Sequence, residues 1–143
     1  GHSALFVNAA QMLGDLAAQD GDNALRRRFA HYARPDVLVI DEIGYLSYGT
    51  RHADLLFEIV NRRYERKPTI ITTNRPFAEW SEVFPNAACV VSIVDRLIHH
   101  AEILVIEGES YRMHEAKQRA ARKTTAKSRK RRDRSTDNGD NTA

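Results

Sequence analysis

Short apolar runs alternate with longer amphipathic segments along most of the chain. Three runs are rich in β-branched and large apolar residues, as buried strands are: residues 4–7 (ALFV), 37–40 (VLVI) and 69–72 (TIIT). Apolar residues recur at helical spacing in four further segments: residues 9–19, 24–33, 53–66 and 92–100. The alternation of strand and helix predicts a parallel sheet with right-handed crossovers and helices on both faces, which is a three-layer α/β domain.

The C-terminal part of the chain departs from this alternation. Residues 103–106 and 111–114 flank Gly108-Glu109-Ser110, which predicts a terminal β-hairpin. From residue 117 onward large apolar side chains are almost absent, so the segment cannot offset the entropy of ordering. We therefore divide the chain into a core domain of residues 1–116 and a basic, disordered tail of residues 117–143.

The formal net charge of +3 hides an asymmetry between these two parts. Residues 1–116 contain 12 Lys+Arg and 16 Asp+Glu, whereas residues 117–143 contain 10 Lys+Arg and 3 Asp. A basic block of this kind is typical of solvated arms, many of which contact polyanions. Non-specific binding to the phosphates of DNA is the interpretation we favour over mere solvation.

The composition also narrows the class of protein. Apolar residues make up 42% of the chain, which suffices for a hydrophobic core, yet none of the apolar runs approaches the roughly 20 residues that cross a bilayer. The single cysteine, Cys89, cannot form an internal disulfide, which suits a reducing compartment. We expect a cytoplasmic protein without a membrane partner.

Two adjacent carboxylates follow the apolar run at residues 37–40. A parallel strand delivers the residues after it to the carboxyl edge of the sheet, where open α/β folds bind ligands. Asp41 and Glu42 repel each other there, which is tolerable if a cation and a water lie nearby. Asp41 would then bind Mg²⁺ in the manner of a Walker-B aspartate, and Glu42 would orient the attacking water. The alternative is that Asp41 caps the next element and Glu42 is solvated.

Three further polar residues are candidates for the same chemistry. Asn74 ends the next apolar run and could hold a water against a γ-phosphate, although Asn74-Arg75-Pro76 also reads as a turn. Arg96 lies near the start of a helix, as an arginine finger for a neighbouring subunit or as a partner in an internal salt bridge. Arg112 is a weaker candidate for a second phosphate sensor and otherwise a solvated strand residue.

The histidine pair His99-His100 is a weaker signal. Neighbouring residues on a helix point about 100° apart, and the sequence offers neither a cysteine nor a carboxylate at ligand spacing. We therefore expect both histidines to lie on a helix surface or at an interface rather than to bind a metal ion.

Taken together, three stretches of the sequence carry a resemblance to a known family. VLVIDEIGYL, LLFEIVNRRYERKPTIITTNRPFAEWSEVF and IVDRLIHHAEILVIEGESYRMHE resemble the IstB-type transposition helper ATPases and, less closely, the DnaC-type helicase loaders. The resemblance covers about residues 1–116. It implies a P-loop ATPase core of the AAA+ kind that binds ATP and Mg²⁺, assembles into homo-oligomers on DNA and serves a transposase.

The resemblance also implies roles for individual residues. Asp41 and Glu42 match the Walker-B pair, Asn74 matches sensor 1, Arg96 matches the arginine finger and Arg112 matches the sensor-2 arginine. Asp41 is accordingly the expected Mg²⁺ ligand and, with Arg112, an expected contact of the nucleotide.

One departure from the family pattern is the Walker-A loop, G-x-x-x-x-G-K-[ST], which does not occur in the sequence. We expect an N-terminally truncated core that lacks the first strand and the P-loop. Such a chain would bind ATP weakly and hydrolyse it negligibly by itself, so enzymatic activity of this chain stays open. Two alternatives also stay open: a helicase loader of the DnaC kind, and a catalytically inactive DNA-binding or interaction fragment.

Overall fold

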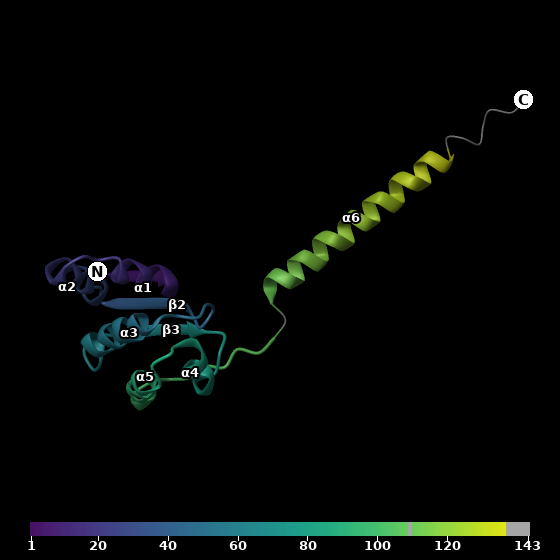
Figure 1. Cartoon of the computed structure of the whole chain (residues 1–143). Helices are drawn as coiled ribbons and strands as arrows, with labels where there is room; N and C mark the ends of the chain where they lie inside the picture. The colour runs from purple at the N-terminus through teal and green to yellow at the C-terminus, as the bar shows by residue number, and fades with distance from the viewer. Residues whose placement is uncertain (109, 137–143) are drawn as a thin grey trace, which may run out of the picture. The chain divides into compact units, whose positions relative to one another are not determined.

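The computed structural model describes residues 1–108 and 110–136, and it divides the chain into two units, Gly1–Ile103 and Leu104–Ala143. The first unit is built on a three-stranded parallel sheet in the order β1-β2-β3 (Figure 1). The strands are β1 (Ala4–Asn8), β2 (Val37–Ile43) and β3 (Thr69–Thr73). The predicted parallel α/β architecture is confirmed, with the run that ends in two carboxylates as the central strand.

Helices connect and follow the strands of the first unit. They are α1 (Ala9–Ala17), α2 (Asp22–Ala33), α3 (Thr50–Arg63), α4 (Trp80–Val83) and α5 (Ala87–His99), with a 3-10 turn, η1 (Phe77–Glu79), before α4. Two of these helices begin at an asparagine cap: the side chain of Asn8 accepts from the Ala10 amide, and that of Asn86 accepts from the Cys89 amide.

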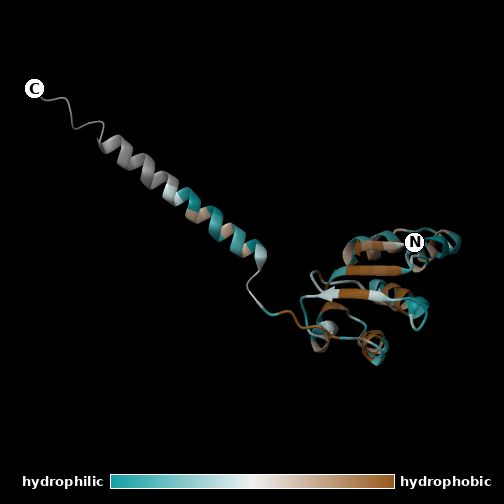
Figure 2. Cartoon of the chain, turned by 180° about the vertical axis from the view of Figure 1, so that it is seen from behind, coloured by the Kyte–Doolittle hydropathy of each residue, from teal (hydrophilic) through white to brown (hydrophobic). Residues whose placement is uncertain are grey.

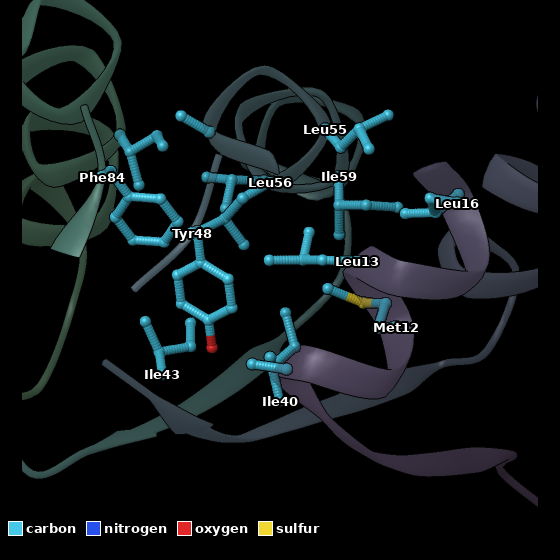
Figure 3. Close-up of a cluster of buried hydrophobic side chains, with 14 of the residues drawn as sticks. Met12, Leu13, Leu16, Ile40, Ile43, Tyr48, Leu55, Leu56, Ile59 and Phe84 are labelled. Atoms are coloured by element: carbon cyan, nitrogen blue, oxygen red, sulfur yellow. The ribbon is translucent and has the colours of Figure 1, made fainter. Parts of the chain in front are cut away.

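The hydrophobic core lies between one face of the sheet and the helices α1 and α3. Figure 3 shows Met12 and Leu13 of α1 beside Ile40 of β2 and Ile59 of α3, and all four side chains are fully buried. Each such burial contributes roughly 1.5–3 kcal/mol to folding. The core therefore fixes α1 and α3 on the sheet, and with them the ends of β1 and β2.

The opposite face of the sheet carries an apolar row. Phe6, Val39 and Ile70 are register partners across the three strands, and Phe6 and Ile70 are 67% and 52% exposed. Figure 2 shows that much of the length of the strands is coloured as hydrophobic. The prediction of helices on both faces is therefore wrong for the described residues, where helices cover a single face. An apolar run in the sequence indicates that a strand is buried, but it does not identify the segment that covers it.

A buried arginine binds the backbone at the edge of the sheet where β2 and β3 begin. Arg63, the last residue of α3, is 2% exposed, and its guanidinium donates to the carbonyl oxygens of Ala33 (2.9 Å), Pro35 (2.8 Å) and Pro68 (2.7 Å). These oxygens belong to the end of α2 and to the segments that enter β2 and β3, and the end of a helix leaves such carbonyls without partners. One side chain thus fixes how β2 and β3 start.

The prediction of a C-terminal hairpin is wrong. Residues 104–106 form no strand, and Leu104 and Ile106 are 77% and 94% exposed. The expected second strand is the start of a long helix, α6 (Tyr111–Thr136). An isolated two-stranded hairpin is marginal in water, whereas Ala, Gln, Lys and Arg, which dominate this segment, are strong helix formers.

Helix α6 also crosses the predicted domain boundary at residue 116. Residues 117–136 belong to this helix, and residues 137–143 lie outside the described part of the chain. The division between a core of residues 1–116 and a basic tail stays a prediction.

Candidate functional site

The central strand ends in a β-bulge. The register between β2 and β3 shifts between Ile40 and Ile43, which leaves Asp41 and Glu42 together opposite Thr72. Bulges of this kind re-aim side chains and recur beside active sites. Glu42 has a φ of 60°, a left-handed conformation that costs a non-glycine residue on the order of 1–3 kcal/mol. The bulge turns the two consecutive carboxylates away from the regular alternation of the strand.

A single hydroxyl group closes this bulge. Thr72 Oγ1 accepts a hydrogen bond from the Glu42 backbone amide at 2.9 Å and donates one to Oδ1 of Asp41. The bonds replace the ladder pairing that the extra residue of β2 interrupts. Asp41 is half-buried as a result, while Glu42 stays exposed.

The end of β1 holds the second carboxylate. Asn8 is the register partner of Asp41, and its Nδ2 donates a 2.8 Å hydrogen bond to Oε2 of Glu42. Its Oδ1 accepts from the Ala10 amide at 2.9 Å and so caps α1. One side chain therefore ties the first turn of α1 to the carboxylate of Glu42.

The two acids lack a cationic partner in the described part of the chain. None of the ion pairs there, taken within 4.0 Å, includes Asp41 or Glu42. Thr72 binds one oxygen of Asp41, and Asn8 binds one oxygen of Glu42, so each carboxylate keeps an oxygen for a ligand. Carboxylate oxygens at a sheet edge are the ligands that Mg²⁺ prefers, so the residues fit the ion that the sequence predicts.

The segment after the bulge is also fixed by side chains. Gly44 has a φ of 91°, and its carbonyl oxygen accepts a 3.2 Å hydrogen bond from Nε of Arg75. The Arg75 guanidinium lies 3.6 Å from both Glu79 and Glu82. Arg75, which the sequence analysis treated only as part of a turn, therefore links the end of β2 to η1 and α4.

The remaining predicted residues are not drawn into this cluster. Asn74 directly follows β3 at the same edge, but among the described residues its side chain bonds to neither Asp41 nor Glu42. Arg96 lies in the last turn of α5, not near the start of a helix as expected, because the helix begins at Ala87; it donates to Oδ1 of Asn61 on α3 at 2.6 Å. Arg112 is an exposed residue of α6, in the second unit of the chain. The roles assigned to these three residues stay predictions.

Sequence reasoning missed two members of the cluster, Asn8 and Thr72. Each is a polar residue at the end of a predicted strand, on the edge where Asp41 and Glu42 were expected. Neighbouring parallel strands bring such ends together, so the same rule that singled out Asp41 could have included them.

The parallel sheet, its helices and the carboxylates at the end of the central strand define the class: this domain has the fold of a P-loop ATPase core of the AAA+ kind. The family of IstB-like ATP binding proteins matches residues 1–120, and the chain belongs to this family.

Relatives from insertion sequences of several bacteria align with most of the chain. It is 36% identical over 115 residues to a putative ATP-binding protein of insertion sequence IS5376 from Geobacillus stearothermophilus. It is 40% identical over 115 residues to that of IS21 from Pseudomonas aeruginosa. The alignments cover 80% of this chain but 46% and 43% of those relatives, so the chain spans less than half of their length.

A solved structure supports the fold. The crystal structure of a DNA replication initiation factor aligns with 94% of this chain and 50% of its own, with a TM-score of 0.65 at 16% sequence identity. Likeness at this identity concerns the fold alone. Among the described helices, none is both long enough and apolar enough to cross a membrane.

Proposed function

We propose that this chain carries the hydrolysis residues of an ATP-driven helper protein in insertion-sequence transposition. The family and the names of the insertion-sequence relatives support ATP and this genetic context. The observation that carries the proposal is the bulge at the end of β2, where Thr72 and Asn8 hold Asp41 and Glu42 side by side. Stability alone does not explain a strained backbone that presents two acids without a cationic partner among the described residues.

Within this proposal each residue has a defined task. Asp41 would hold Mg²⁺ through the oxygen that Thr72 leaves free, and the ion would supply positive charge opposite the phosphates. Glu42 accepts a proton from the attacking water through the oxygen that Asn8 leaves free. Asn74, which follows β3 at the same edge, positions that water against the γ-phosphate.

The two arginines act from outside the cluster. Arg96 is held by Asn61 within one chain, and we propose that it reaches the phosphates of a neighbouring subunit in a homo-oligomer. Arg112 contacts the nucleotide as a second sensor. These assignments rest on the resemblance of their sequence context to the family.

The hydrolysis proposal requires a phosphate-binding loop, which none of the 143 residues provides. The test therefore uses a chimera in which residues 1–120 replace the matching part of the Pseudomonas aeruginosa relative. We expect Mg²⁺-dependent ATP hydrolysis that Glu42→Gln lowers by about 100-fold or more while ATP binding persists. Glu102→Gln, a change at an exposed acid outside the cluster, is the control. Unchanged hydrolysis in the Glu42→Gln chimera would contradict the proposal.

We further propose that the protein acts on DNA in the cytoplasm together with a transposase, and that the basic segment beyond residue 116 supplies phosphate contacts. Binding of duplex DNA by the 143-residue chain should fall steeply with salt and be lost on deletion after Lys117. Asp41→Ala should leave this binding unchanged. In pull-downs with the chimera, recovery of a replicative helicase in place of a transposase would favour the helicase-loader alternative.

A further inference from the structure

Three potential metal ligands converge away from the candidate ATP site. Glu65 lies in the turn between α3 and β3, His99 is the last residue of α5, and His100 follows it. One ligand atom of each side chain lies within 4.8 Å of those of the other two. All three residues are exposed, so a dissolved ion can reach them.

The helix end explains why the two histidines converge although they are neighbours. His100 has φ −131° and ψ 18°, which departs from helical geometry and turns its ring relative to that of His99. The two ring centroids are 4.2 Å apart. The expected divergence of about 100° between neighbours applies within a helix and fails at this terminus.

The carboxylate comes from a distant part of the sequence. Glu65 has a φ of 55°, and its Oε1 lies 2.8 Å from Nε2 of His100. Ligand spacing in the sequence does not reveal this carboxylate, because β3, η1, α4 and most of α5 lie between Glu65 and the histidine pair. The packing of α5 against α3 brings the three residues together.

The surroundings of His99 match those of metal-binding histidines. Its Nδ1 lies 2.6 Å from the hydroxyl of Tyr64, which leaves Nε2 available. Histidines that bind metal ions almost always engage the second ring nitrogen in a hydrogen bond, which fixes the orientation of the ring. The Arg96 guanidinium packs 5.4 Å from the centre of the Tyr64 ring and holds the tyrosine in place.

We propose that Glu65, His99 and His100 bind a divalent transition-metal ion of the Zn²⁺ type. Two imidazole nitrogens, one carboxylate oxygen and a water make up a known tetrahedral set for Zn²⁺. Ligand atoms around such an ion lie roughly 3.4 Å apart, which small rotations of exposed side chains achieve. Mg²⁺, which requires oxygen ligands, is excluded from this set. The ion would join the end of α5 to the turn after α3.

Isothermal titration of the full chain with Zn²⁺ tests this proposal without ATP, so it is independent of the proposed hydrolysis. The titration uses a His2→Ala background, because the exposed imidazole of His2 beside the N-terminus is a separate potential ligand. We expect one Zn²⁺ per chain. Loss of a hydrogen-bond partner of a ligand costs about 10–100-fold in affinity, so His99→Ala, His100→Ala and Glu65→Gln should each cost at least about tenfold. Tyr64→Phe removes the hydrogen-bond partner of His99 and should by the same principle weaken binding by about tenfold.

Two control variants sharpen this result. His31→Ala removes an exposed histidine elsewhere, and Asp41→Asn removes the acid of the candidate ATP site; both should bind Zn²⁺ as the background does. Zn²⁺ should also raise the midpoint of thermal unfolding of the His2→Ala protein but not that of its His100→Ala variant. Mg²⁺ at the same concentration should raise neither midpoint. The proposal is overturned if Zn²⁺ does not bind, or if His31→Ala or Asp41→Asn weakens binding as much as the ligand variants.

Discussion

The side-chain amide of Asn8 donates a 2.8 Å hydrogen bond to Oε2 of Glu42, across the ends of β1 and β2. The same side chain caps α1 through its oxygen. Its two ends therefore serve two purposes: the oxygen stabilises a helix, and the nitrogen orients an acid of the candidate site. Substitutions of Asn8 can therefore separate the effect of the helix cap from the effect of the hydrogen bond to Glu42.

Asn8→Ser should retain the cap but lose the amide donor to Glu42. Serine caps helices about as well as asparagine and adds no charge beside Glu42 and Asp41, so the free energy of unfolding should stay within about 0.5 kcal/mol, whereas Asn8→Ala should lower it by about 1 kcal/mol. Hydrolysis by the chimera should fall in both variants, because Glu42 loses its hydrogen bond. Urea unfolding and a hydrolysis assay measure the two effects. Undiminished hydrolysis in Asn8→Ser would show that the bond to Glu42 is dispensable.

Thr72→Val should destabilise the bulge without changing the size of the side chain. Valine has no hydroxyl group, so it can neither accept the hydrogen bond from the Glu42 amide nor donate one to Asp41. Each such bond contributes roughly 0.5–1.5 kcal/mol to the free energy of unfolding. Because Thr72 is exposed, water can replace part of the lost hydrogen bonding, and we expect the free energy of unfolding to fall by about 1 kcal/mol. Thr72→Ser keeps the hydroxyl and should lose less. Equal losses for serine and valine would contradict a role for the hydroxyl.

The fold was predictable to the extent that local pattern determines it. The apolar runs around Leu5, Ile40 and Ile71 gave the three strands because β-branched residues in short runs have few alternatives. Residues 103–106 have the same apolar character and form no strand. A strand needs a partner, and neither the pairing nor the layer that covers a face is encoded in the run itself.

The candidate site divides in the same way. Asp41 and Glu42 were identifiable because two acids after a buried strand are unusual. The bulge was not, because its extra residue is defined only by the register with β3, and Thr72 acquires its role through that register. The cluster of Glu65 with His100 was missed for a related reason: its members meet through tertiary packing alone.

Arg63→Lys should be strongly destabilising. The guanidinium donates to carbonyl oxygens at the end of α2 and in the segments that enter β2 and β3, while a lysine ammonium has fewer donors and a different geometry. Burial lowers the pKa of the Arg63 guanidinium, which reflects how far it is removed from water. We expect a loss of about 2–4 kcal/mol in the free energy of unfolding, measured with urea. Arg66→Lys, at an exposed position three residues later, should change it by less than about 0.5 kcal/mol.

A second polar cluster makes stability depend on pH. Oδ2 of Asp15 on α1 accepts hydrogen bonds from Tyr32 (2.6 Å) and Arg28 (2.5 Å) on α2. Burial alone would raise the pKa of Asp15, but the bonds from Tyr32 and Arg28 outweigh it and lower that pKa. Burial, together with the bond to Asp15, raises the pKa of Tyr32 to about 12. The contact between Asp15 and Tyr32 therefore stabilises the fold only between an acid and an alkaline pH limit.

On the acid side, the lowered pKa of Asp15 means that its stabilisation is present above the unfolded value of about 3.9 and is lost as pH falls through the folded value. Asp15→Asn should therefore flatten the fall of the urea midpoint below about pH 4. Asp20→Asn, at an exposed acid nearby, should not. An acid fall of equal steepness in Asp15→Asn and the parent chain would show that Asp15 does not set this limit.

On the alkaline side, the sign is reversed because the folded pKa of Tyr32 is raised. Its contribution is complete below the unfolded value of about 10 and is lost as pH rises through about 12, when the unfolded chain releases the proton more readily. Tyr32→Phe should start from a lower urea midpoint at pH 8, because it loses the bond to Asp15, but decline less between pH 10 and 12. Tyr45→Phe, at an exposed tyrosine, should decline as the parent does. If Tyr32→Phe declines as steeply as the parent, the alkaline limit lies elsewhere than in the contact between α1 and α2.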